Sequence, residues 1–187
     1  GAENPGLKDG MDKAARFIMS KQKEDGSFPY SNSNPGRQPN ITGAAVLSLQ
    51  LLGYGSEAAT RQGLQYLRDA DASWSRPPQA PLYAWYYVTQ ARFHQGGPAW
   101  SSWNEKCAPT LIRNQNEDGS WLSPGLALTG DGVEREFRGE EINTKVYATT
   151  LAALSLQVYY RFLPTYQPIE DKVIDQTSED DITIEIL

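Results

Sequence analysis

The single histidine and the single cysteine of this 187-residue chain are its strongest candidates for catalysis. His94 shares one face of an expected helix with Tyr87 and Gln90, where it could serve as a catalytic base. The end of a helix also favours histidine through the helix dipole, without any catalysis. Cys107 lies one helical turn from both Trp103 and Leu111, which predicts a buried, inert thiol. No catalytic residue is therefore assigned.

A second candidate site is aromatic and would bind a ligand rather than react with it. Three expected helices can be aligned by counting back from Gly53 and Gly96 and from the Ser-Leu-Gln shared by residues 48–50 and 155–157. Two sets of residues then share a level, meaning an equivalent position near the helix start: Thr42, Trp85 and Thr149 in one set, and Asn40, Tyr83 and Tyr147 in the other. Core packing explains such residues, and so does an amphipathic pocket for an apolar or sugar-like ligand. The candidate ligand-binding residues are Thr42, Tyr83, Trp85, Tyr87, His94, Tyr147 and Thr149.

These residues would be positioned by a repeat of 46 to 47 residues. Each copy of the repeat contains one short motif, which occurs as Asp25-Gly26-Ser27-Phe28, Asp71-Ala72-Ser73-Trp74 and Asp118-Gly119-Ser120-Trp121. The period suits a helical hairpin that stacks on the next hairpin. Gly would allow the backbone to leave a helix, Gln would satisfy backbone groups at the helix end, and the aromatic side chain would fill the groove between hairpins. The residues given this structural role are Gln22, Gly26, Phe28, Trp74, Gln115, Gly119 and Trp121.

Apolar periodicity predicts six helices. Those at about 7–22, 56–70 and 99–115 are amphipathic, and Pro109 is expected to kink or split the last of them. Those at about 40–53, 82–93 and 145–163 carry little charge and should be buried on most sides. The alternation predicts an all-α fold with an outer and an inner layer, curling toward an α/α toroid.

The negative charge of the chain is confined to its end. Residues 168–187 hold seven acidic residues and one lysine, which accounts for the whole formal net charge of −6. We therefore expect one domain of three repeats at 1–167 and an acidic tail at 168–187. A neutral body without a basic stripe argues against a nucleic-acid partner. The absence of an apolar run of about 18 residues argues against a membrane span.

The repeated motif resembles that of the prenyltransferase and squalene-oxidase repeat family, which includes terpene cyclases and protein prenyltransferase β-subunits. The pattern is carried by Phe17-Ile18, Gln22 and Gly26-Ser27-Phe28, and less fully by Leu111, Gln115 and Gly119-Ser120-Trp121. The segments 86–90 and 158–164 are similar to uncharacterised bacterial members. The resemblance covers about residues 10–165 and implies roughly half of an α/α toroid in a bacterial protein, with export as one alternative for its compartment.

The known catalytic motifs of that family are not found in this chain. The nearest approach to the Asp-x-Asp-Asp motif of squalene-hopene-type cyclases is Ser178-Glu179-Asp180-Asp181, in the tail. The zinc site of protein prenyltransferases needs Asp, Cys and His, so with one Cys and one His no metal or other cofactor is expected. A divergent enzyme would have to take its acid from the polar insertion 124–141, either a lid or a plain surface loop, at Asp131, Glu134, Glu140 or Glu141.

Three functional interpretations follow. The leading one is a non-catalytic module that binds a hydrophobic, glycan or protein ligand in an aromatic-lined concavity. The second is a divergent enzyme resembling a terpene cyclase, a prenyltransferase or a polysaccharide lyase. The third is a structural half-toroid that pairs with a second copy or with a missing N-terminal half, since three hairpins alone would leave apolar flanks exposed.

Overall fold

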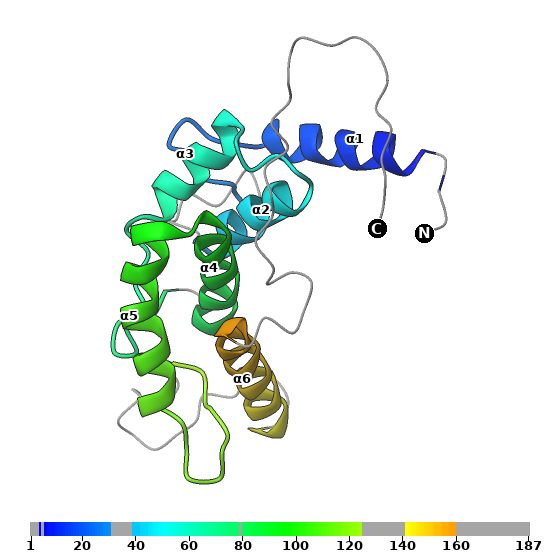
Figure 1. Cartoon of the computed structure of the whole chain (residues 1–187). Helices are drawn as coiled ribbons and strands as arrows, with labels where there is room; N and C mark the ends of the chain where they lie inside the picture. Colours follow the sequence, from blue (N-terminus) through cyan, green and yellow to red (C-terminus); the bar gives the residue numbers. More distant parts are fainter. Residues whose placement is uncertain (1–3, 5, 31–38, 79, 125–140, 160–187) are drawn as a thin grey trace, which may run out of the picture.

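A computed structural model describes residues 4, 6–30, 39–78, 80–124 and 141–159, and this part of the chain is helical and without strands (Figure 1). Its helices are α1 (Leu7–Met19), α2 (Pro39–Leu51), α3 (Ala58–Leu67), α4 (Pro81–Gln95), α5 (Gly97–Arg113) and α6 (Glu141–Leu156), and a 3₁₀ turn follows at Gln157–Tyr159. The predicted all-α class is confirmed. The acidic tail lies outside the described residues, as does most of the polar insertion.

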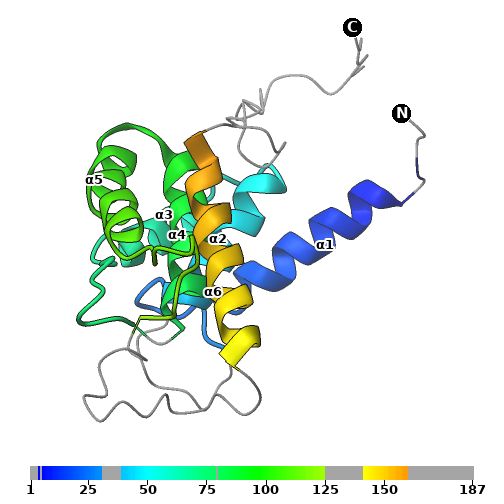
Figure 2. The same cartoon turned by 90° about the horizontal axis from the view of Figure 1, so that it is seen from below.

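Helices α2, α4 and α6 pack side by side with α4 in the middle, and α3 and α5 cover α2 and α4 from one side (Figures 1 and 2). The three central helices are the ones with little charge, so they can be surrounded by apolar neighbours. Val46 and Leu49 of α2 and Trp85 and Val88 of α4 are fully buried in the core. Closure of these layers into a toroid stays a prediction.

Helix α1 departs from the expected outer layer. It contacts α2 but reaches away from the other helices in both views (Figures 1 and 2). Of its residues only Ala15 is fully buried, whereas Leu7, Met11 and Phe17 are 57%, 37% and 64% exposed. The Tyr54 hydroxyl donates a hydrogen bond of 2.8 Å to Asp12 and ties α1 to the end of α2. An apolar flank of the first hairpin is therefore open.

Pro109 does not split the fifth helix, because α5 runs unbroken from Gly97 to Arg113. Proline removes one backbone donor from the helix interior. On either side of it, Cys107 and Leu111 are buried in the core, so tertiary packing holds both halves of α5 in one helix. Of the two expected outcomes, the split was wrong because it considered only the local cost of proline, and the kink stays a prediction.

The first and third copies of the repeated motif fold into the same loop. Gln22 Nε2 donates to the carbonyl of Gly26 at 3.0 Å, and Gln115 Nε2 donates to the carbonyl of Gly119 at 2.9 Å. The two glycines have φ angles of 84° and 82°, in the left-handed region that favours glycine. Glutamine thus closes a turn that glycine makes possible.

The aspartates of the motif stabilise the same turn. Asp25 Oδ1 accepts hydrogen bonds from the backbone N–H of Ser27 at 3.0 Å and from its hydroxyl at 2.6 Å. Asp118 Oδ1 accepts from Ser120 at the same two distances. These hydrogen bonds lower the pKa of both aspartates, Asp25 and Asp118, because they favour the ionised form. The recurrence of the sequence is therefore a recurrence of one hydrogen-bonded unit.

Each of these two loops is anchored to a central helix through its aromatic residue. The backbone N–H of Phe28 donates to Thr42 Oγ1 of α2, and that of Trp121 donates to Thr149 Oγ1 of α6, both at 3.0 Å. Phe28 and Trp121 are themselves buried, and the Trp121 indole donates to the carbonyl of Leu111 at 2.8 Å. The loop and the start of the next central helix are thereby held together.

The middle copy, which lacks the first glycine and the glutamine, is anchored differently. Trp85 occupies the position on α4 that Thr42 occupies on α2. Its indole Nε1 donates a hydrogen bond to the carbonyl of Asp71 at 3.1 Å. The ring of Trp74 lies against that of Trp85, with centroids 5.8 Å apart. Here the central helix supplies the donor and the loop supplies the acceptor.

Replacing each motif glycine by alanine separates the cost of the turn from the cost of packing. Gly119→Ala should lower the unfolding free energy by about 1–2 kcal/mol, because only the left-handed backbone opposes a Cβ. Gly26→Ala should cost more, since its Cβ would meet the backbone oxygen of Gln62 at 2.5 Å, whereas at Gly119 the nearest atom is 4.0 Å away. Urea denaturation of both variants measures the difference, and equal losses would contradict this packing.

Candidate functional site

Four tyrosines gather near the starts of α4 and α6, and we call them the tyrosine cluster: Tyr83, Tyr86, Tyr87 and Tyr147. The rings of Tyr83 and Tyr87 meet edge to face with centroids 4.8 Å apart, and those of Tyr86 and Tyr87 do so at 5.0 Å. Tyr147 of α6 joins them through an electrostatic interaction with Tyr83. The three α4 residues are half-buried and Tyr147 is 49% exposed, so the cluster reaches the surface.

The cluster depends on how closely α4 is held between its neighbours. Tyr83, Tyr86 and Tyr87 share a face of α4 because they are three and four residues apart. On one side α2 crosses at Gly43, where a Cβ would lie 3.0 Å from Tyr87 Cβ and 3.2 Å from Val88 N. On the other side α6 packs against α4 and brings Tyr147. A glycine on α2 thus permits the crossing that positions the tyrosines.

Two phenols of the cluster, those of Tyr87 and Tyr147, are held in the neutral form by their surroundings. Burial, followed by a hydrogen bond with Tyr83, raises the pKa of Tyr87 to about 12. Burial and the neighbouring Tyr83 also raise the pKa of Tyr147. Neutral phenols can donate and accept hydrogen bonds, while their rings offer apolar surface. The cluster is therefore amphipathic.

The structure brings together Tyr83, Tyr87 and Tyr147 from the predicted set, and it adds Tyr86, which sequence reasoning missed. The signal for Tyr86 was its position three residues after Tyr83 on the same helix face. The other predicted residues are engaged elsewhere. Thr42 and Thr149 accept the backbone bonds of the repeat loops, and Trp85 is buried with its indole donating to the carbonyl of Asp71.

His94 lies in the last turn of α4, away from the cluster. Its ring packs edge to face against Phe93, with centroids 5.5 Å apart. Two helical turns separate it from Tyr87, roughly 10 Å along the axis. The ring of Tyr87 instead meets that of Tyr83, which lies in the opposite direction along the helix.

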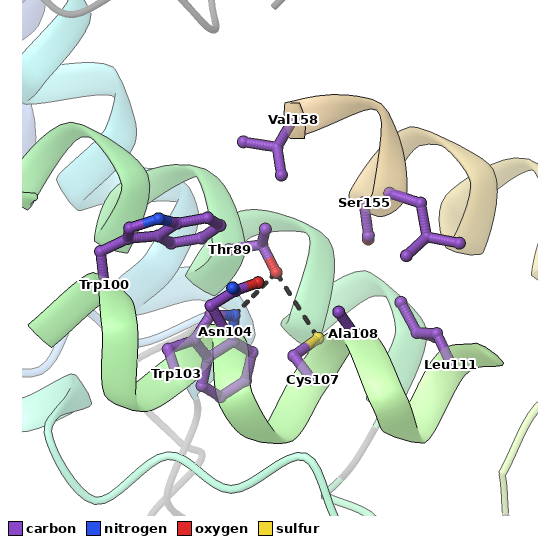
Figure 3. A pocket seen from close by; sticks show the side chains of 10 residues that line it. Thr89, Trp100, Trp103, Asn104, Cys107, Ala108, Leu111, Ser155 and Val158 are labelled. Carbon is purple, nitrogen blue, oxygen red and sulfur yellow. Dashed lines mark hydrogen bonds between the residues drawn. The ribbon is translucent and has the colours of Figure 1, made fainter. Parts of the chain in front are cut away.

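Cys107 borders a small cavity between α4, α5 and α6 (Figure 3). Thr89 Oγ1 accepts a hydrogen bond from Trp103 Nε1 at 2.9 Å and lies 3.8 Å from Cys107 Sγ. Burial raises the pKa of Cys107 to about 12, so the thiol stays protonated and unreactive. The cavity volume of about 10 Å³ is enough for one water molecule. The predicted buried thiol is confirmed.

Of the four acidic residues proposed as a catalytic acid, only one lies in the described part of the chain. Asp131, Glu134 and Glu140 lie outside the described residues, and Glu141 is the first residue of α6. Within the described ranges, no group of three or more His, Cys, Asp or Glu side chains could hold a metal ion. No helix in this same part of the chain combines the length and the apolar character needed to cross a membrane.

Comparison of the chain with protein-family models, curated proteins and solved structures gives no match. The resemblance to the prenyltransferase and squalene-oxidase repeat family therefore stays a prediction based on the motif residues. The function has to be inferred from the geometry of the chain itself.

The raised pKa of Tyr87 predicts how stability depends on pH. In the unfolded chain a tyrosine ionises at about pH 10, whereas folded Tyr87 remains neutral up to about pH 12. Its stabilising contribution is complete below about pH 10 and is lost as the pH rises toward 12.

The midpoint of urea unfolding, measured from neutral pH upward, should therefore fall over this window. The fall should be smaller in Tyr87→Phe and unchanged in Tyr30→Phe, whose tyrosine is 78% exposed. Identical profiles for all three proteins would contradict the assignment.

Proposed function

We propose that this protein is a non-catalytic binding module that recognises a neutral glycan through the tyrosine cluster. The observation that carries the proposal is a group of three half-buried tyrosines on α4, with ring centroids 4.8 and 5.0 Å apart, beside the 49% exposed Tyr147 of the packed helix α6. Aromatic rings can stack on the apolar faces of sugars, and phenol hydroxyls can exchange hydrogen bonds with sugar hydroxyls. A hydroxylated ligand would use both properties of the cluster.

The polarity of the cluster favours a glycan over a hydrocarbon ligand. A purely apolar ligand that covered the cluster would separate the phenol hydroxyls from water without replacing their hydrogen bonds, at a cost of about 1–3 kcal/mol for each group left unpaired. A glycan would offer new partners for them. Apolar and protein ligands become the alternative outcomes of the binding test.

The electrostatics of the site favour a neutral ligand. The pKa of about 12 keeps Tyr87 uncharged. Lys145, in the second turn of α6, lies 3.9 Å from the carboxylate of Asp118 in an ion pair. A charged ligand would therefore meet no unbalanced opposite charge from this pair.

The same geometry favours binding over catalysis. A general acid or base works best when its pKa lies near the working pH, and that of Tyr87 lies well above it. His94 lies two turns further along α4 and packs against Phe93, while the ring of Tyr87 meets that of Tyr83. This arrangement supports a binding surface better than a tyrosine–histidine pair for proton transfer.

Calorimetric titration with neutral oligosaccharides tests the proposal. Cello-, xylo-, malto- and chito-oligosaccharides form the panel, and at least one should bind. The double variant Tyr83→Ala/Tyr147→Ala should weaken that binding about tenfold or more, which corresponds to ~1.4 kcal/mol. Tyr30→Ala, an exposed tyrosine outside the cluster, is the matched control and should bind as the unmodified protein does. A panel without any binder, or equal affinity for the double variant, would overturn the proposal.

A further inference from the structure

A cleft of about 500 Å³ is lined by residues of α3, α4 and α5. Helices α3 and α5 lie on the same side of α4 (Figures 1 and 2). None of its lining residues is acidic, and four of them are cationic: Arg61, Arg68, Arg92 and Lys106. The volume lies within the range typical of small-molecule sites. Because the four cations come from different parts of the chain, the cleft has no counterpart in any sequence motif.

Arg92 is a buried cation in the lining of this cleft. It is only 5% exposed, and its guanidinium donates to Gln95 Oε1 at 2.9 Å, while its buried Nε makes no hydrogen bond within the described structure. No described carboxylate forms an ion pair with it. Burial lowers the pKa of Arg92, and the charge of Asp69 offsets this only in part. A buried cation without a paired anion is costly, which points to a ligand that supplies the negative charge.

The surrounding cations are also poorly balanced by acids of the described chain. Arg61 donates to the backbone carbonyl of Ser56, a neutral partner. Only Arg68 has an acidic contact, an exposed one of 3.4 Å to Asp69. Three of the four cations, Arg61, Arg92 and Lys106, therefore lack an ion pair with a described carboxylate.

The start of α5 adds to the positive potential of the cleft. Pro98, Ala99 and Ser102, all in the first turns of this 17-residue helix, line the cleft. The amides at a helix N-terminus are unpaired within the helix and carry partial positive charge. Helix and cations together favour an anion in the cleft.

We propose that the cleft between α3 and α5 is an anion site, independent of the tyrosine cluster, for a small molecule that bears a phosphate group. Phosphate carries up to two negative charges and three acceptor oxygens, so it can match several converging donors, which a single carboxylate cannot. Arginine offers the planar, forked donors that suit phosphate. The inferred ligand would place its phosphate against Arg92, with Arg61 and Lys106 closing on it from α3 and α5.

The first test replaces Arg92 by methionine, which keeps much of the side-chain volume and removes the charge. Without phosphate, Arg92→Met should raise the melting temperature, because a buried unpaired cation is lost. Added inorganic phosphate should raise the melting temperature of the unmodified protein and leave that of Arg92→Met unchanged. A variant that is less stable and still responds to phosphate would overturn the proposal.

The second test uses surface residues that are not needed for the core. Arg61→Ala/Lys106→Ala should weaken phosphate binding, measured by calorimetry at constant ionic strength, about tenfold or more. Arg113→Ala, an exposed arginine at the end of the same helix α5, is the matched control and should bind phosphate normally.

Two further measurements separate this proposal from general charge effects and from the glycan proposal. Tyr83→Ala/Tyr147→Ala should respond to phosphate as the unmodified protein does, so that failure at one site leaves the other testable. Chloride at matched ionic strength should produce no stabilisation. Equal stabilisation by chloride, or equal loss of phosphate binding in Arg113→Ala, would show non-specific screening and reject the site.

Discussion

One hydrogen bond, made twice, underlies the architecture of this chain. The backbone N–H of the aromatic residue in the repeat loop donates to a threonine on the next central helix, from Phe28 to Thr42 and from Trp121 to Thr149. Thr42 is fully buried, so leaving this bond unmade would cost about 1–3 kcal/mol. The bond sets where each loop meets the start of a central helix, and the aromatic side chain then fills the junction.

The same constraint decides which residues are left for function. Thr42 and Thr149 use their hydroxyls as loop anchors, and Trp85 makes the equivalent link with the direction of donation reversed, toward the Asp71 carbonyl. Tyr83 and Tyr147, two residues before Trp85 and Thr149, make no such link to a repeat loop among the described residues. Together with Tyr86 and Tyr87 they place phenols of α4 and α6 near the surface, which is why the binding proposal rests on the tyrosine cluster.

Local patterns could predict the helices, because apolar spacing and turn residues act within a few positions of each other. The alignment of the repeats also predicted that Tyr83 and Tyr147 would occupy equivalent positions on two helices. Whether a residue there anchors a loop or can bind a ligand depends on its burial, which is set by tertiary packing. The outward reach of α1 and the unbroken α5 across Pro109 likewise depend on packing. The cationic cleft escaped prediction because Arg61 and Lys106, far apart in a chain body of zero net charge, meet only after folding.

Amide hydrogen exchange of Phe28 and Trp121 is the most direct test of the repeated anchor. In the unmodified protein both amides should be protected. Thr42→Val, which keeps the shape and removes the acceptor, should accelerate exchange at Phe28 and leave Trp121 protected, and Thr149→Val should do the reverse. Rapid exchange of both amides in the unmodified protein, or no change in either variant, would contradict the account.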